Sequence, residues 1–175
     1  MNNKITREDA ILELATYGIG DHYIYLIDLF PMIEMIWSDG QTQPIEFAVL
    51  DHYLEQRLAS LDQEAGYSVI SREQAQSFIQ RYLSRDTPPD PILMRNVRRL
   101  IVPIRLSSSD PEANRVIWEF IISGCLDVAA SAITQYPYPL TQRLDDQEKR
   151  CLFEIIESLD YRSSSIEITA IDAAD

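Results

Sequence analysis

Cysteine is scarce in this sequence, and the two that occur, Cys125 and Cys151, form no CxxC pair. Each lies inside an apolar helical pattern without a nearby histidine to activate a thiolate, so we expect buried thiols in a reducing compartment. The first residues, MNNKITRED, lack the apolar stretch of a signal peptide, and no acceptor sequence for N-glycosylation occurs. These absences argue against secretion and predict a cytoplasmic protein.

Long hydrophobic runs are also lacking. The most apolar stretch, residues 23–37, contains Asp28, Pro31 and Glu34. It is too short and too polar to cross a bilayer core, which takes about 20 apolar residues. We therefore predict no transmembrane segment, and a buried helix in this region.

Positive charge is in deficit, since 15 Lys and Arg face 28 Asp and Glu, for a formal net charge of -13. Such a chain repels phosphate backbones, so no direct binding to nucleic acid is expected. The one basic candidate is a helical stripe of four arginines, Arg95, Arg98, Arg99 and Arg105. We interpret this stripe as a solvated face that pairs with the acidic surplus.

The remaining composition predicts a folded helical protein. The 175 residues are 46% apolar and 25% charged, which is typical of a globular protein and favours one domain over residues 1–175. Apolar residues recur at helical spacing, and capping residues such as Thr6, Ser71 and Asp145 precede several of the runs. No segment before the C-terminal tail has a convincing period of two, so the predicted class is all-α.

Seven helices are predicted, and two prolines should disturb them. Pro31 is expected to kink the second helix, and Pro103 to bend or end the fifth. The tail, residues 163–175, fits a docked or frayed terminus, although its alternating isoleucines also fit a short strand. The helices are expected at roughly residues 6–15, 21–38, 44–65, 71–83, 92–106, 111–132 and 145–159.

Acidic residues placed in apolar helices are the main functional signal. An unpaired carboxylate in low dielectric is strongly disfavoured, so Glu34 in the second helix needs a partner. Asp39 and Glu46 follow it, and the three should converge around one helix-loop-helix corner. A second corner repeats this pattern with Asp127 and Glu148, but there the Asp-Gly dipeptide of residues 39–40 is replaced by Ala-Ile.

These segments resemble the tellurite-resistance TerB-like family. The match is carried by PMIEMIWSDGQTQPIEF (31–47), SGCLDVAASA (123–132) and LDDQEKRCLFEII (144–156), which cover under half of the chain. The resemblance implies an all-helical bundle of two pseudo-symmetric halves, a cytoplasmic role linked to tellurite or metal stress, and binding of a divalent cation. The metal ligands that it implies are Glu34, Asp39, Glu46, Asp127 and Glu148.

Each of these acids also has a structural explanation. Glu46 and Glu148 occupy the third position of their helices, where capping alone favours a carboxylate. Asp39 with Gly40 fits an ordinary turn. Glu34 and Asp127 could instead be paired by arginines of the fifth helix. If a cation is bound, oxygen ligands favour calcium, magnesium or manganese over zinc.

Other ligands and motifs are not expected. His22 and His52 are each interpreted as a satisfied structural or surface histidine. No EF-hand, di-iron motif, P-loop, Rossmann fingerprint or nucleophile elbow occurs, so a carboxylate-based enzyme is the least favoured function.

The alternative to metal binding is a helical scaffold. In this reading the acids are purely structural, and the partners are other proteins, including membrane-associated stress complexes, or a second copy of the chain. Its motivation is the excess of acidic residues together with four tyrosines that we expect at the surface, Tyr23, Tyr25, Tyr136 and Tyr138.

Overall fold

The computed structural model describes residues 5–83, 87–131 and 144–160, and the predicted tail, Tyr136 and Tyr138 lie outside these ranges. Within them the chain forms seven α-helices and one 3-10 helix with no strand, which confirms the all-α class. None of the described helices is long and apolar enough to cross a membrane. The elements are α1 (Arg7–Thr16), η1 (Asp21–Leu29), α2 (Phe30–Ile36), α3 (Pro44–Ala65), α4 (Arg72–Gln80), α5 (Pro91–Arg105), α6 (Pro111–Ser131) and α7 (Asp146–Ser158).

The predicted single helix over residues 21–38 is wrong, because this stretch is divided into η1 and α2. Pro31 falls in the first turn of α2, where its missing N–H leaves no hydrogen bond unmade, so it starts a helix instead of kinking one. Because apolar residues fill almost every position here, periodicity could not reveal the break. The predicted burial is confirmed, since η1 and α2 supply the centre of the hydrophobic core.

The predicted helix caps at Thr6, Ser71 and Asp145 are confirmed. Thr6 accepts a hydrogen bond from the backbone N–H of Asp9 at 3.1 Å and begins α1. Ser71 and Asp145 begin α4 and α7, each in a capping box. Gly66 ends α3 at a φ of 77°, a left-handed conformation that suits glycine. Pro103 does not end α5, which continues to Arg105.

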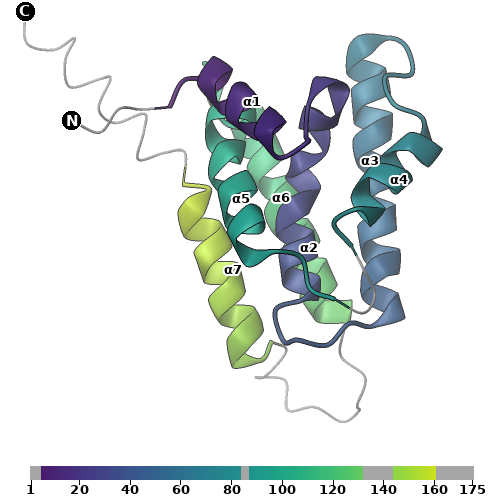
Figure 1. Cartoon of the computed structure of the whole chain (residues 1–175), viewed down its shortest axis with the longest axis vertical. Helices are drawn as coiled ribbons and strands as arrows, with labels where there is room; N and C mark the ends of the chain where they lie inside the picture. Colours follow the sequence, from purple (N-terminus) through teal and green to yellow (C-terminus); the bar gives the residue numbers. More distant parts are fainter. Residues whose placement is uncertain (1–4, 84–86, 132–143, 161–175) are drawn as a thin grey trace, which may run out of the picture.

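Helix α2 lies in the middle of the bundle, with α6 behind it, α5 and α7 on one side and α3 on the other (Figure 1). The approach of α2 to α6 is close at Gly124, where an added Cβ would lie 2.1 Å from Cε of Met32. The end of α2 and the starts of α3 and α7 lie at the same, lower end of the bundle in Figure 1. That end carries most of the candidate residues, while the predicted pseudo-symmetry of two halves stays a prediction.

Candidate functional site

A buried ionic network centred on Asp28 was not predicted from the sequence. Asp28 is 1% exposed. Arg105 donates from Nε to both of its carboxylate oxygens at 3.1 Å and from Nη2 to Oδ2 at 3.0 Å. Arg57 places Nε 3.3 Å from Oδ2 and also donates from it to the carbonyl of Tyr25 at 3.1 Å. Burial lowers the pKa of Arg57, an effect that the charge of Asp28 opposes.

Glu34 has an arginine partner from α5. Nη1 of Arg98 donates to both carboxylate oxygens, at 3.1 and 3.0 Å, and both side chains are largely buried. Burial raises the pKa of Glu34, and the charge and hydrogen bonds of Arg98 act against that rise. Arg98 Nη2 also lies 3.9 Å from Glu154. The positive partner that Glu34 needs is therefore a protein side chain, one of the two explanations left open by the sequence.

The interpretation of the arginine stripe as a solvated face is wrong for two of its four arginines. Arg98 and Arg105, seven residues apart, lie on the inner side of α5, where they meet Glu34 and Asp28. Arg95 and Arg99, four residues apart, are exposed, and Arg99 pairs with Glu13 of α1. The four arginines fall on two neighbouring strips of the helix surface, and only the strip of Arg98 and Arg105 faces the buried acids.

Asp127 is exposed, so the expectation that it lies in an apolar face and there needs a positive partner is wrong. The hydroxyl of Tyr53 donates to its Oδ2 at 2.6 Å, and no arginine reaches it among the described residues. Tyr53 itself is 7% exposed. Burial and the neighbouring carboxylate of Asp127 raise the pKa of Tyr53 well above its ordinary value, so the tyrosine stays the donor.

Asp39, Glu46 and Glu148 form what we call the acid corner. Glu46 and Glu148 are 3% and 8% exposed, and each accepts a hydrogen bond from the backbone N–H of its own N-cap residue, at 2.6 and 2.7 Å. Asp39 caps its own turn by accepting from the backbone N–H of Gln41 at 2.8 Å. All three predicted local roles, two capping boxes and one turn, are thus present.

The three carboxylates of the acid corner are close enough to repel one another. Burial, followed by the charges of Asp39 and Glu148, raises the pKa of Glu46 to about 7, against the lowering effect of its backbone hydrogen bond. The pKa of Glu148 is raised by burial and by the charges of Asp145 and Asp39. Within the described residues, the acid corner contains no salt bridge to any of its three carboxylates, whereas Asp28 and Glu34 each form one with an arginine.

The structure thus brings together three of the five predicted metal ligands and leaves Glu34 and Asp127 in other contacts. Within the described ranges, no three His, Cys, Asp or Glu side chains are already arranged to hold a metal ion. At the acid corner, one oxygen of each carboxylate accepts a hydrogen bond from a nearby backbone N–H.

Two of the four tyrosines and both histidines lie within the described residues. Tyr23 stacks on Phe78 with ring centroids 4.6 Å apart, and Tyr25 lies under the guanidinium of Arg105, so the exposure expected for these two aromatics is wrong. Of the histidines, His52 is exposed and contacts Gln56, whereas Nε2 of His22 is buried without a hydrogen-bond partner in the described chain, so His22 is not satisfied.

Both cysteines are free, Cys125 buried and Cys151 partly so. Burial raises the pKa of Cys125 well above its ordinary value and that of Cys151 to about 12. At neutral pH both are therefore protonated thiols, which lack the nucleophilicity of a thiolate.

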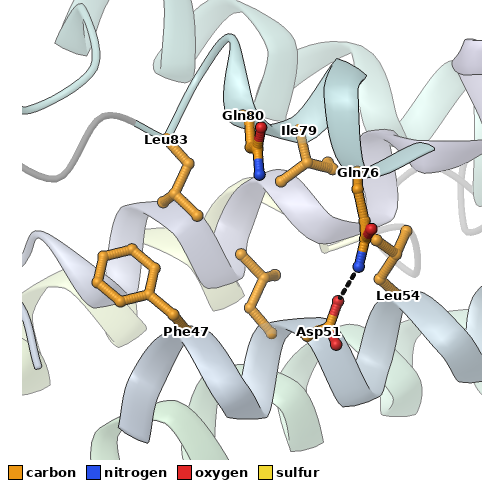
Figure 2. A pocket seen from close by; sticks show the side chains of 8 residues that line it. Phe47, Asp51, Leu54, Gln76, Ile79, Gln80 and Leu83 are labelled. Atoms are coloured by element: carbon orange, nitrogen blue, oxygen red, sulfur yellow. Dashed lines mark hydrogen bonds between the residues drawn. The ribbon is translucent and has the colours of Figure 1, made fainter. Parts of the chain in front are cut away.

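A groove lined by five apolar and three polar residues lies between α3 and α4 and has a volume of about 220 Å³ (Figure 2). Phe47 and Leu83 border one end of it, and at the other end Gln76 donates to Asp51 at 2.9 Å. Its walls are otherwise formed by Leu50, Leu54, Ile79 and Gln80.

Comparisons with protein-family models, with curated proteins and with solved structures find no match for this chain. The class that the described residues define is a helical bundle, and the resemblance to the TerB-like proteins stays a prediction.

Proposed function

We propose that this chain is a non-catalytic, TerB-like helical domain that binds a divalent cation at the acid corner. The observation that carries the proposal is a contrast between buried acids. Asp28 and Glu34 are each paired by arginine, whereas Glu46 and Glu148, which are over nine-tenths buried, form no salt bridge within the described residues. Each has a backbone cap and the charge of Asp39 acting on it, and Lys149 acts on Glu148 through its charge without a salt bridge to it. A cation is the partner that this corner lacks.

The cation would draw together groups that now repel. Each buried glutamate gives one oxygen, Oε2, to its cap, so its other oxygen can act as a ligand without opening the helix. Carboxylate ligands favour calcium, magnesium or manganese. Binding would join the segment after α2 to the starts of α3 and α7, and so fix the angles between these helices. The cytoplasmic role in tellurite resistance or metal stress rests on the resemblance alone.

Thermal unfolding tests this proposal. A ligand at one hundred times its Kd stabilises the folded state by about 2.7 kcal/mol, and each kcal/mol raises the Tm of a domain of this size by about 2–4 °C. We expect calcium, magnesium or manganese to raise the Tm over that in chelator, and the rise to vanish in a Glu46→Gln/Glu148→Gln variant. Glu112→Gln is the matched control, because Glu112 lies in the first turn of α6 away from the corner. Equal melting curves with and without metal would refute the proposal.

A protein-docking scaffold is the second candidate, and the groove between α3 and α4 favours it. Its apolar side chains are arranged around a hollow that an apolar side chain of a partner could fill (Figure 2). We expect a Phe47→Ser/Leu83→Ser variant to lose a partner that wild type and a Glu55→Gln control both retain in cross-linking. A sedimentation profile that is monomeric, together with no cross-linked product, would argue against the scaffold.

A further inference from the structure

Helix η1 is unusually long for a 3-10 helix, since it extends over nine residues. Its two ends show the hydrogen bonds of this helix type, which join residues three apart. Tyr23 donates to the carbonyl of Gly20 at 3.1 Å, and Phe30 donates to the carbonyl of Ile27. Runs longer than three or four residues are uncommon, because the hydrogen-bond geometry is poorer than in an α-helix. Since η1 runs directly into α2, some contact must keep it from continuing the α-helix (Figure 1).

Burial of apolar side chains does not select the 3-10 form of η1. Its buried apolar residues are Ile24, Leu26, Ile27 and Leu29. Because apolar residues stand at nearly every position instead of on one stripe, an α-helix of the same segment would bury similar side chains. Asp28 is the buried charged residue of η1. The choice between the two helix types therefore depends on polar contacts, which are known to fix register in apolar surroundings.

Two arginines contact η1 at residues that lie one 3-10 turn apart, and we call these contacts the clamp. Arg57 of α3 donates from Nε to the carbonyl of Tyr25 at 3.1 Å, and the same atom lies 3.3 Å from Oδ2 of Asp28. Arg105 of α5 donates to both carboxylate oxygens of Asp28 and lies over the ring of Tyr25, 5.5 Å from its centroid. Residues three apart stand directly above one another in a 3-10 helix, whereas an α-helix rotates them about 60° apart.

The N-terminal end of η1 has a joint that can take up a change in length. Gly18 and Asp21 have φ angles of 76° and 50°, a left-handed conformation that is uncommon for a residue with a side chain. Conversion of nine residues from a rise of about 2.0 Å to about 1.5 Å each would shorten η1 by about 4–5 Å. It would also rotate Tyr23 by about 140° relative to Phe30, at about 20° per residue. Tyr23 would then leave Phe78 of α4, on which it stacks with ring centroids 4.6 Å apart.

We propose that η1 is a conformational switch, which the clamp holds in its stretched 3-10 form. Release of the clamp lets η1 shorten into an α-helix that is continuous with α2. The joint takes up the change in length, and α4 loses its aromatic stack on η1. Because the arginines of the clamp come from α3 and α5, a movement of either helix away from Asp28 is transmitted to α4, which forms one wall of the groove.

NMR spectroscopy of the full chain distinguishes the two forms of η1. Contacts from the Hα of one residue to the amide proton two residues later mark a 3-10 helix, and contacts to the amide proton four residues later mark an α-helix. We expect the 3-10 pattern in wild type. An Asp28→Leu/Arg57→Met/Arg105→Met variant should show the α pattern and lose the ring contacts between η1 and α4. Removal of all three charges leaves no buried charge of the clamp unpaired, so this variant should fold.

Two further variants separate the clamp from a general effect of losing a buried ion pair. Glu34→Met/Arg98→Met is the matched control, because it removes an ion pair that joins α5 to α2 instead of η1, and its η1 should keep the 3-10 pattern. Arg105→Met leaves Asp28 beside Arg57 and should show both patterns, which decides the question if the triple variant does not fold. The proposal is overturned if η1 is α-helical in wild type, if it keeps the 3-10 pattern in each clamp variant that folds, or if it converts in the control.

Discussion

Arg98 holds Glu34 through a single nitrogen, Nη1, which lies 3.1 and 3.0 Å from the two carboxylate oxygens. The pair joins the central helix α2 to α5 across 64 residues of sequence. Glu34 is the only charged residue of α2, so this ion pair is the one place where the helix meets other elements through a charged side chain. The energetics of this contact can be tested directly.

Breaking the pair on one side should destabilise the fold strongly. Arg98→Met leaves the buried carboxylate of Glu34 unpaired, and we expect a loss of about 3–5 kcal/mol in the free energy of unfolding. Because two apolar side chains remove both charges at once, a Glu34→Met/Arg98→Met variant should recover much of that loss. Urea denaturation of the two single variants and the double variant measures the coupling. Additive losses would show that the pair is not an energetic unit.

The network around Asp28 should be comparably sensitive. Asp28→Asn leaves two arginines, Arg57 and Arg105, without their carboxylate, and we expect a loss of about 3–5 kcal/mol. Asp51→Asn is the control, since Asp51 also pairs with an arginine, Arg72, but at the surface, and its loss should stay below about 1 kcal/mol. Chemical denaturation measures both. Similar losses for the two variants would contradict the account.

Glu46 should make stability depend on pH in a defined direction. Because burial and neighbouring charges raise its pKa from 4.5 to about 7, the folded state binds a proton that the unfolded state has released. The contribution of Glu46 to stability is therefore fully present below about pH 4.5 and is lost as the pH rises through about 7. We expect Glu46→Gln to flatten the fall in Tm between pH 5 and pH 8, measured in chelator. A profile of unchanged slope in that variant would show that other groups cause it.

Gly124 should tolerate no larger residue without loss. A Cβ there would lie 2.1 Å from Cε and 2.6 Å from Sδ of Met32, which is fully buried, so that side chain must move within a packed core. We expect Gly124→Ala to lose about 1–3 kcal/mol. Met32→Ala should be less harmful in the Gly124→Ala background than in wild type, since the new methyl partly fills the cavity that it leaves. Thermal melts of the four proteins measure this, and strictly additive effects would exclude the contact.

The thiols should be inert in the folded protein. Cys125 is fully buried, and burial raises the pKa of both cysteines, so neither supplies a thiolate at pH 8. A disulfide reagent such as Ellman's should react slowly with the native protein and rapidly in guanidinium chloride. Rapid reaction of native Cys151, followed in a Cys125→Ser variant, would contradict the burial described for α7.

Short-range features of the fold were predictable because both partners stand within one turn of helix. The capping boxes that begin α4 and α7 join residues three positions apart, and each could be read directly from the sequence. The division of residues 21–36 between η1 and α2 could not, since nearly every residue there is apolar and leaves no period to read.

Polar contacts between residues far apart in the sequence could not be predicted, for a different reason. Asp127 meets Tyr53 across 74 residues, and Asp28 meets Arg105 across 77, and nothing local marks either partner. The need of Glu34 for a partner was predictable from its apolar surroundings, whereas the buried pairing of Asp28 was not predicted. Convergence of Asp39 and Glu46 was predictable from one tight helix-loop-helix corner, whereas the addition of Glu148 to the same cluster depends on how α7 packs.

Whether the acid corner binds a cation is decided most directly by equilibrium dialysis against calcium, magnesium or manganese, followed by elemental analysis of the protein. The account predicts metal bound in an equimolar amount to wild type, to Glu34→Gln and to Asp127→Asn, and lost from Glu46→Gln/Glu148→Gln. It is contradicted if wild type retains no metal, or if the Glu46→Gln/Glu148→Gln variant retains as much as wild type.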